Sequence, residues 1–144
     1  MKVHTVDFEE FFAVVGNLQW QNTDIKESWD LGYKSPYDAF DKANSAWARF
    51  YLIKHRGKVL SAIMEQRDGN LVYFTTVDLP GSNLRRYVKV MRELSNKTIK
   101  CRDVIFVEVA SWYKQAKKLL KLSGFKKYHI TNKYEVWYKD GKQN

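Results

Sequence analysis

The chain has 144 residues, of which 44% are apolar and 22 are aromatic (5 Trp, 9 Tyr and 8 Phe), enough for one packed domain but hardly for two. It has only two prolines and seven glycines, contains no run of about 18 apolar residues that would span a membrane, and starts with an acid-rich segment unlike a secretory signal. The formal net charge is +9 and uneven: residues 1–80 carry 9 basic and 11 acidic residues, and residues 81–144 carry 16 and 5.

The basic second half predicts a polyanionic partner: nucleic acid, a phosphorylated cofactor or an acidic protein surface. The alternative is a solvated lysine surface that only keeps the protein in solution. The lone cysteine, Cys101, excludes an intramolecular disulfide and is typical of a reducing compartment. We therefore expect a cytoplasmic protein with one domain over residues 1–144 and no membrane partner.

The first elements are short. Residues 3–6 are predicted to form a strand, and Asp7 is a helix cap with Glu10 as its capping-box partner. A helical apolar face follows and a glycine ends it, at Phe8, Phe11, Phe12, Val15 and Gly16.

Residues 17–33 show no clear period and are interpreted as a long loop or a broken helix. A second helix is predicted to begin at Ser35, where a hydroxyl cap is followed by a proline and an acid. From Ala46 the period changes to two, and strands are predicted at residues 47–54, 59–66 and 71–77. Asp68-Gly69 is typical of a type I′ turn, which favours an antiparallel meander.

The second half alternates helix and strand. Residues 84–94 have the period of a basic amphipathic helix, and residues 104–110 form a buried strand. The next helix places Ala116 inward and its lysines, Lys117 among them, in solvent. Residues 125–130 and 134–139 are predicted to make a closing hairpin. Its aromatic residues look exposed and could stack bases, or the hairpin packs half inside or forms a dimer seam: Tyr128, Tyr134, Trp137 and Tyr138.

This order predicts an α/β fold (α+β by its layers), with a twisted mixed central sheet of about seven strands flanked by about four helices. A strand, helix, strand connection in such a sheet needs a right-handed crossover. It leaves a gap between two parallel neighbours, where open α/β sheets bind ligands. Phe74 or Phe106 would close this gap if either pointed into it.

The element order, together with Ala116 and Gly124-Phe125, resembles the GNAT family of N-acetyltransferases over essentially the whole chain. The family closes with the pattern Asn-x-x-Ala-x-x-x-Tyr-x-x-x-Gly-Phe. The resemblance implies a GNAT-like fold and transfer of an acyl group from acetyl-CoA to an amine. The residues that it places at the cofactor are Thr76, Val77, Asp78, Gly81, Ser82, Arg85 and Arg86.

Three departures from the family pattern imply weak or lost activity. The family binds the pyrophosphate with a glycine-rich loop of backbone N–H donors, and only Gly81 remains of its glycines. Leu120 stands where the family has its tyrosine acid, and Tyr113 stands where it has asparagine. Similar erosion is associated with small GNAT-like proteins of tailed bacteriophages, which this chain resembles in that respect.

Four residues are candidates for the chemistry that remains. Glu65, on the middle strand of the meander, and Glu108 are possible bases. Glu108 is the only charge in a seven-residue apolar run, where burial would raise the pKa of its carboxyl group. Glu65 is alternatively a solvated strand end, and Glu108 alternatively points to a loop or pairs with a lysine. Tyr113 and Ser111 are possible acids, although Tyr113 is alternatively a packing or helix-capping residue.

Other site classes find little support. The three histidines and one cysteine lack the spacing of a metal site, so no metal is expected. Arg85, Lys89 and Arg92 share one helix face and, with Lys97, Lys100 and Arg102, would follow a phosphate backbone. The sequence thus leaves two functions open. One is a GNAT-like N-acyltransferase with weak or lost activity, and the other is a non-catalytic or virion-associated protein that binds nucleic acid or a protein through its basic half.

Overall fold

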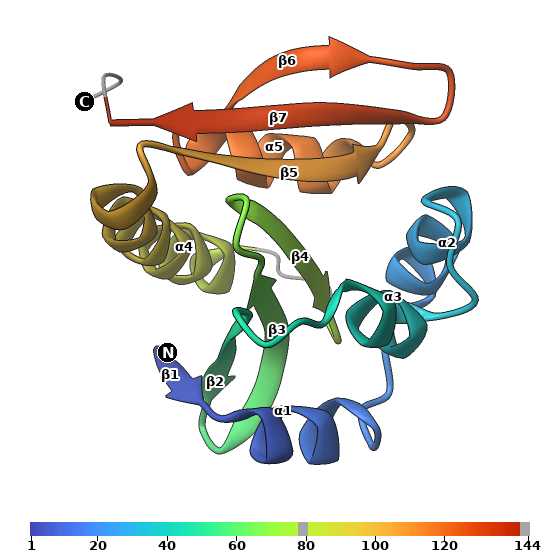
Figure 1. Cartoon of the computed structure of the whole chain (residues 1–144), viewed down its shortest axis with the longest axis vertical. Coiled ribbons are helices and arrows are strands. Elements are labelled where there is room, and N and C mark those ends of the chain that lie inside the picture. Colours follow the sequence, from blue (N-terminus) through green and yellow to red (C-terminus); the bar gives the residue numbers. More distant parts are fainter. Residues whose placement is uncertain (78–80, 142–144) are drawn as a thin grey trace.

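A computed structural model describes residues 1–77 and 81–141. Within these residues the chain forms seven strands and five helices (Figure 1). In chain order they are β1 (Lys2–Val6), α1 (Phe8–Val15), α2 (Asn22–Asp30), α3 (Pro36–Ala43), β2 (Arg49–His55), β3 (Lys58–Glu65), β4 (Asn70–Thr75), α4 (Ser82–Arg102), β5 (Val104–Ala110), α5 (Lys114–Leu122), β6 (Lys126–Ile130) and β7 (Tyr134–Asp140).

The strands form one mixed sheet of seven strands, as predicted, and their order is β1-β2-β3-β4-β5-β7-β6. β4 and β5 are the one parallel pair among the described strands. Their register joins only Asn70 to Phe106 and Leu71 to Val107. Past Leu71 the two strands no longer pair, so the sheet divides there into the meander β1–β4 and the unit formed by β5, β7 and β6 (Figure 1).

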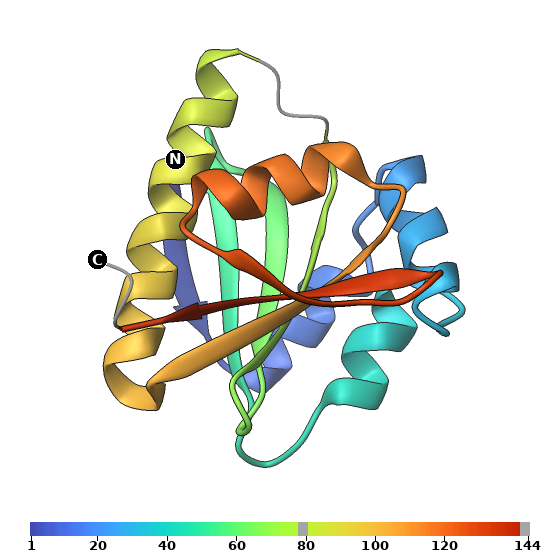
Figure 2. The ribbon, with the colours of Figure 1, turned by 90° about the horizontal axis from the view of Figure 1, so that it is seen from above.

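Helices cover both faces of the sheet (Figure 2). α1 and α3 pack on the meander through Phe11 and Phe40, which contact Phe50 and Phe74 of β2 and β4. On the opposite face, Tyr87 and Met91 of α4 and Leu119 of α5 share a buried cluster with β2 and β3. The remaining inward residues of α5 pack on β5 and β7.

Local sequence signals account for the first and third helices. The Asp7 carboxylate accepts a hydrogen bond from Glu10 N at 2.8 Å, and the Ser35 hydroxyl accepts one from Asp38 N at 3.0 Å. Pro36 occupies the first turn of α3, where its missing N–H is not needed. Both predicted helix starts are confirmed.

The meander is confirmed, but the type I′ turn assigned to Asp68-Gly69 is wrong. Only Gly69 has a positive φ there (+92°), and Gly69 N donates to Gln66 O, as in a type I turn followed by a left-handed residue. The conformation of a type I′ turn, with two consecutive positive φ angles, is instead found at Arg56 (51°) and Gly57 (78°) between β2 and β3.

Two helices differ from the sequence-based expectation. Residues 17–33 contain α2, a regular helix, so the described helices number five rather than about four. Its buried residues are Asp24, Glu27 and Ser28, which no apolar period can reveal. α4 runs to Arg102 instead of ending at Leu94, because Thr98 and Ile99 continue its buried side.

The closing hairpin packs half inside, one of its predicted alternatives: Trp137 is buried against α5, because β7 lies inside the sheet between β5 and β6. The expectation that Lys117 stands in solvent is wrong. Lys117 is paired with the buried Glu135 rather than standing free in solvent. Among the described residues, no helix combines the length and apolar character needed to cross a membrane.

Candidate active site

A cavity of about 180 Å³ lies where β4 and β5 diverge. Its walls come from α2, the end of β4, the first turn of α4 and the start of α5. The residues that line it are Gln21, Asp24, Glu27, Tyr73, Thr75, Val77, Leu84, Tyr113, Gln115, Ala116, Lys118 and Leu119. Phe74 packs against Phe40 and Phe106 against Tyr128, so neither phenylalanine closes the gap.

The carboxylates of α2 hold the two separated strands. Asp24 Oδ2 accepts from Thr75 N of β4 at 2.5 Å, and Glu27 Oε2 accepts from Ala110 N of β5 at 3.0 Å. Asp30, one turn further, accepts from the indole N–H of Trp112 at 2.5 Å. α2 thus satisfies backbone donors that the diverging strands cannot give to each other.

Burial raises the pKa of two of these acids, Asp24 and Glu27. Burial raises the pKa of Glu27 from 4.5 to about 8, against the opposing effect of the Ala110 hydrogen bond, and the charges of Asp24 and Asp30 raise it further. Burial also raises the pKa of Asp24, although hydrogen bonds from Tyr113, Thr75 and Gln21 act in the other direction. Glu27 can therefore gain and lose a proton near neutral pH.

Two phenols stand beside these acids. The Tyr113 hydroxyl donates to Asp24 Oδ1 at 2.6 Å and accepts from Gln21 Nε2 at 2.9 Å. Burial and the neighbouring Asp24 carboxylate raise its pKa, so it stays protonated. The Tyr73 hydroxyl is buried and has no hydrogen-bond partner within residues 1–77 and 81–141. Burial holds the pKa of Tyr73 well above 10, which leaves a neutral, unused donor at the cavity.

Of the four residues considered for catalysis, only Tyr113 lines the cavity. Glu65 is fully buried, but it lies at the end of β3 that is far from the cavity, opposite Leu71 in the β3–β4 register. There its carboxylate accepts a hydrogen bond from the Tyr51 hydroxyl and forms an ion pair with Arg102. It is therefore not a solvated strand end. Arg102, which the sequence had suggested for phosphate binding, instead compensates the charge of the buried Glu65.

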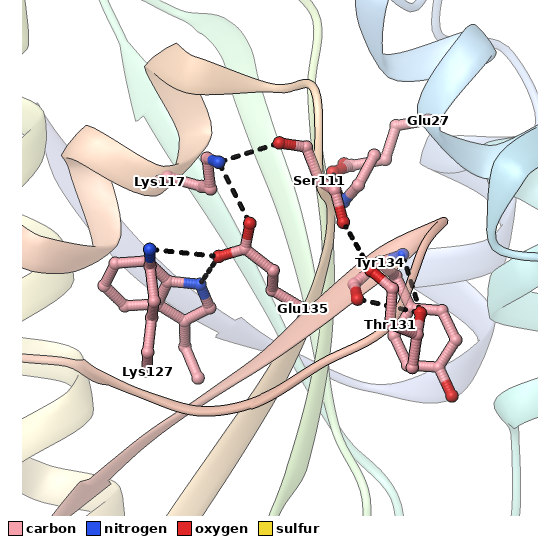
Figure 3. A network of polar contacts seen from close by, with 9 residues as sticks. Glu27, Ser111, Lys117, Lys127, Thr131, Tyr134 and Glu135 are labelled. Carbon is pink, nitrogen blue, oxygen red and sulfur yellow. Dashed lines mark hydrogen bonds and ion pairs between the residues drawn. The ribbon is translucent and has the colours of Figure 1, made fainter.

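The other two candidates point away from the cavity. Glu108 is exposed on β5 and lines a surface hollow together with residues of β4 and with Tyr33 of the segment between α2 and α3. Partial burial raises its pKa. The Ser111 hydroxyl donates to Thr131 O in the turn between β6 and β7 (Figure 3).

Figure 3 also shows how α5 is fixed beside the cavity. Lys117 Nζ lies 2.7 Å from Ser111 O and 3.0 Å from Glu135 Oε2, and the Trp137 indole donates to Glu135 Oε1 at 3.2 Å. These bonds tie α5 to β7, while Glu27 approaches β5 from the opposite direction (Figure 3). Tyr113 immediately precedes α5, so its position is set by the bonds between α5 and β7 and by the bond between Glu27 and β5.

The residues considered for cofactor binding are placed unevenly. Thr76 gives its N–H to Leu60 O and its hydroxyl to Val59 O, so its donors face β3 instead of the gap. Val77 lines the cavity, whereas Asp78 lies outside the described residues. The rest stand at the start of α4, where all four are exposed: Gly81, Ser82, Arg85 and Arg86.

Sequence reasoning missed Asp24, Glu27 and Tyr73. The spacing Asp24-x-x-Glu27-x-x-Asp30 was available as a signal, because residues three and six apart share one side of a helix. An acidic stripe of this kind is usually solvated, and only the folded chain shows that it is buried.

No family model matches the sequence, and no curated protein sequence matches it. Solved structures do match. The GNAT domain of S. lividans PAT has a TM-score of 0.68 at 9% identity, with 96% of this chain and 89% of that chain covered. AAC(6')-Ib in complex with ribostamycin and coenzyme A has a TM-score of 0.70 at 9% identity, with coverage of 99% and 94%.

The spermidine N-acetyltransferase from Vibrio cholerae, in complex with CoA and spermine, has a TM-score of 0.65 at 12% identity, with coverage of 99% and 96%. At such low identities the likeness establishes the fold alone. The chain has the GNAT fold, and its structural neighbours are acetyltransferases with that fold.

Proposed function

We propose that this protein is an acyl-CoA-dependent N-acyltransferase with slow turnover. The observation that carries the proposal is the cavity between β4 and β5, which combines a carboxyl group whose pKa is about 8 with an unpartnered phenol. General bases work best when their pKa lies near the working pH. Perturbed ionisable groups that converge on a cavity mark a candidate active site.

The cavity suits the acyl end of a coenzyme A thioester, which would supply the activated acyl group. Its side walls are apolar, formed by Leu84, Ala116 and Leu119. Arg85 and Arg86 are exposed on the first turn of α4, where the helix N-terminus also favours anions. These two arginines would hold the phosphates by charge, in place of the missing glycines.

Glu27 is the proposed base. An amine acceptor arrives as an ammonium ion and must lose a proton before its nitrogen attacks a thioester. With a pKa of about 8, the Glu27 carboxylate is populated enough near neutral pH to take this proton. Activity should therefore increase as the pH rises toward 8, because the fraction of deprotonated Glu27 increases.

Tyr73 is the proposed donor to the thioester carbonyl. The Thr75 N–H of β4 is given to Asp24 and is not free to polarise that oxygen. Tyr73 lines the same cavity, and its buried hydroxyl remains protonated and has no hydrogen-bond partner within the described residues. A preorganised donor in a water-poor site stabilises charge that develops in the transition state.

Slow turnover follows from two features. Leu120 offers no acid for the departing thiolate, and the Tyr113 proton is engaged with Asp24. Phosphate binding depends on two exposed arginines, and such contacts are weak and sensitive to salt.

The direct test is isothermal titration with acetyl-CoA, followed by a thiol-release assay over a panel of primary amines. We expect micromolar binding that Arg85→Ala/Arg86→Ala weakens about tenfold or more, while Lys34→Ala/Lys133→Ala, exposed in the α2–α3 and β6–β7 connections, leaves it unchanged. Glu27→Gln should retain binding and lose turnover. If the folded protein releases no heat at high micromolar acetyl-CoA, the proposal is refuted.

A further inference from the structure

The outward side of α4 carries a row of cations that the proposed acyl transfer does not use beyond its first turn. This basic row consists of Arg85, Arg86, Lys89, Arg92, Lys97 and Lys100, all exposed. Glu93 is the only acidic residue in the sequence of α4 or α5. None of the six cations forms an ion pair with a carboxylate in the described part of the chain.

The row is only partly compensated within the molecule: Glu93 lies four residues from both Lys89 and Lys97, and Arg92 donates to Leu122 O at 2.5 Å. Arg85 and Lys89 are four residues apart, and Lys97 and Lys100 are three apart, so like charges are neighbours on the helix surface. Such pairs destabilise a helix by about 0.2–0.5 kcal/mol each. Elsewhere the chain does use cations to compensate buried acids, as with Arg102 and Glu65. An external polyanion would relieve the repulsion along α4.

The length of the row suits a phosphate backbone. Arg85 and Lys100 are fifteen residues apart on one continuous helix, which corresponds to about 22 Å at 1.5 Å per residue. A nucleic-acid duplex rises about 3.4 Å per base pair, so the row spans roughly six phosphates of one strand. On the same face of the sheet, α5 adds Lys114, Lys118 and Lys121 at helical spacing, all exposed (Figure 2).

The chemistry of this surface favours a duplex over an anionic lipid bilayer or a single-stranded nucleic acid. Apart from Cys101, every exposed residue of α4 is polar or charged, so the row has no apolar anchor for a lipid bilayer and no aromatic ring for stacking single-stranded bases. The most exposed aromatic residues, Trp29, Trp47 and Tyr128, lie on other elements.

We infer that α4 binds double-stranded nucleic acid independently of sequence, through contacts between the basic row and the phosphate backbone. This activity goes beyond the proposed acyl transfer and does not depend on it. Lys89, Lys97 and Lys100 do not line the cavity between β4 and β5, so substitutions there separate the two functions.

The test is fluorescence anisotropy with 20-base-pair duplexes of DNA and of RNA, each in two unrelated sequences, at 50 to 200 mM salt. The five cations of the row other than Arg92, which donates to Leu122 O, would each contact one phosphate. Five phosphate contacts predict a slope of about −4.5 for log K against log salt, a loss of roughly 500-fold across this range. Lys89→Gln/Lys97→Gln/Lys100→Gln should reduce the slope by about 2.7. The matched control, Lys26→Gln/Lys34→Gln/Lys133→Gln, makes the same change of charge on exposed residues of α2, the α2–α3 connection and the β6–β7 turn and should keep the slope.

Three outcomes would overturn the inference: a flat salt response, an equal loss of slope in both triple variants, or tighter binding to single strands or phosphatidylserine vesicles than to either duplex. Circular dichroism melts of both variants confirm that they are folded. Acetyl-CoA titration of the α4 variant should match that of the parent protein.

Discussion

The raised pKa of Glu27 makes the stability of this protein depend on pH in an unusual direction. The Glu27 side chain is 5% exposed, and its pKa is about 8 in the folded chain against an ordinary 4.5. Between these two values the folded state binds a proton that the unfolded state has released. The free energy of unfolding therefore falls as the pH rises through this window.

The magnitude follows from the two pKa values. Each pH unit of difference between the folded and unfolded pKa corresponds to about 1.4 kcal/mol. A rise from 4.5 to about 8 thus removes up to about 5 kcal/mol of stability between pH 4.5 and 8, with relaxation of α2 lowering this figure. Asp24 acts in the same direction, because its pKa is also raised.

Glu27→Gln isolates this effect. Glutamine keeps an oxygen that can accept from Ala110 N but cannot ionise, so the variant should lose most of the decrease in stability between pH 5 and 9 and be more stable than the parent at pH 9. Urea unfolding at half-unit pH steps measures the difference. Glu9→Gln, exposed in α1, is the matched control and should follow the parent. The reasoning fails if Glu27→Gln and the parent decline in parallel.

Three further outcomes are expected. Tyr73→Phe should slow thiol release about 100-fold while changing acetyl-CoA affinity less than about threefold, because the hydroxyl is assigned to the transition state; an equal change in both constants would contradict that role. Arg102→Ala should cost up to about 3–5 kcal/mol in urea unfolding, since it removes the ion pair of the fully buried Glu65 and leaves only the Tyr51 hydroxyl and the cross-strand Arg49 beside it, and Arg102→Met/Glu65→Leu should recover most of the loss. Gly69→Ala should destabilise the fold by at least about 2 kcal/mol more than Gly32→Ala; both glycines have positive φ (92° and 96°), but only at Gly69 would the new Cβ meet a carbonyl oxygen of β5, at 2.7 Å, and equal thermal melts would refute this reasoning.

Much of the fold was accessible from local patterns. The two capped helix starts, the three strands of the meander and the closing hairpin were predicted because caps, turns and apolar periods act over a few residues. Ala116 and Gly124-Phe125 carried the resemblance to the fold that the structure confirms. The type I′ turn was misplaced because the Asp-Gly pair also suits a type I turn followed by a left-handed glycine.

The candidate site was mostly inaccessible to the same reasoning. α2 was missed because its buried side is acidic, and the groups that stabilise it are distant in the sequence. Asp24 is 51 residues from Thr75, and Glu27 is 83 residues from Ala110. Glu65 was considered for catalysis on the strength of its strand, but Arg102, 37 residues later, makes it part of a structural ion pair.

The order of the elements and the inward sides of most of them are therefore properties of the linear pattern, because the hydrophobic effect depends on how much apolar surface each segment can bury. Which carboxyl groups are buried, and so which pKa values are raised, depends on the folded arrangement. A buried acid is tolerated only where partners from other segments meet it. In this protein the divergence of β4 and β5 provides those partners for α2, and with them the cavity on which the proposed function rests.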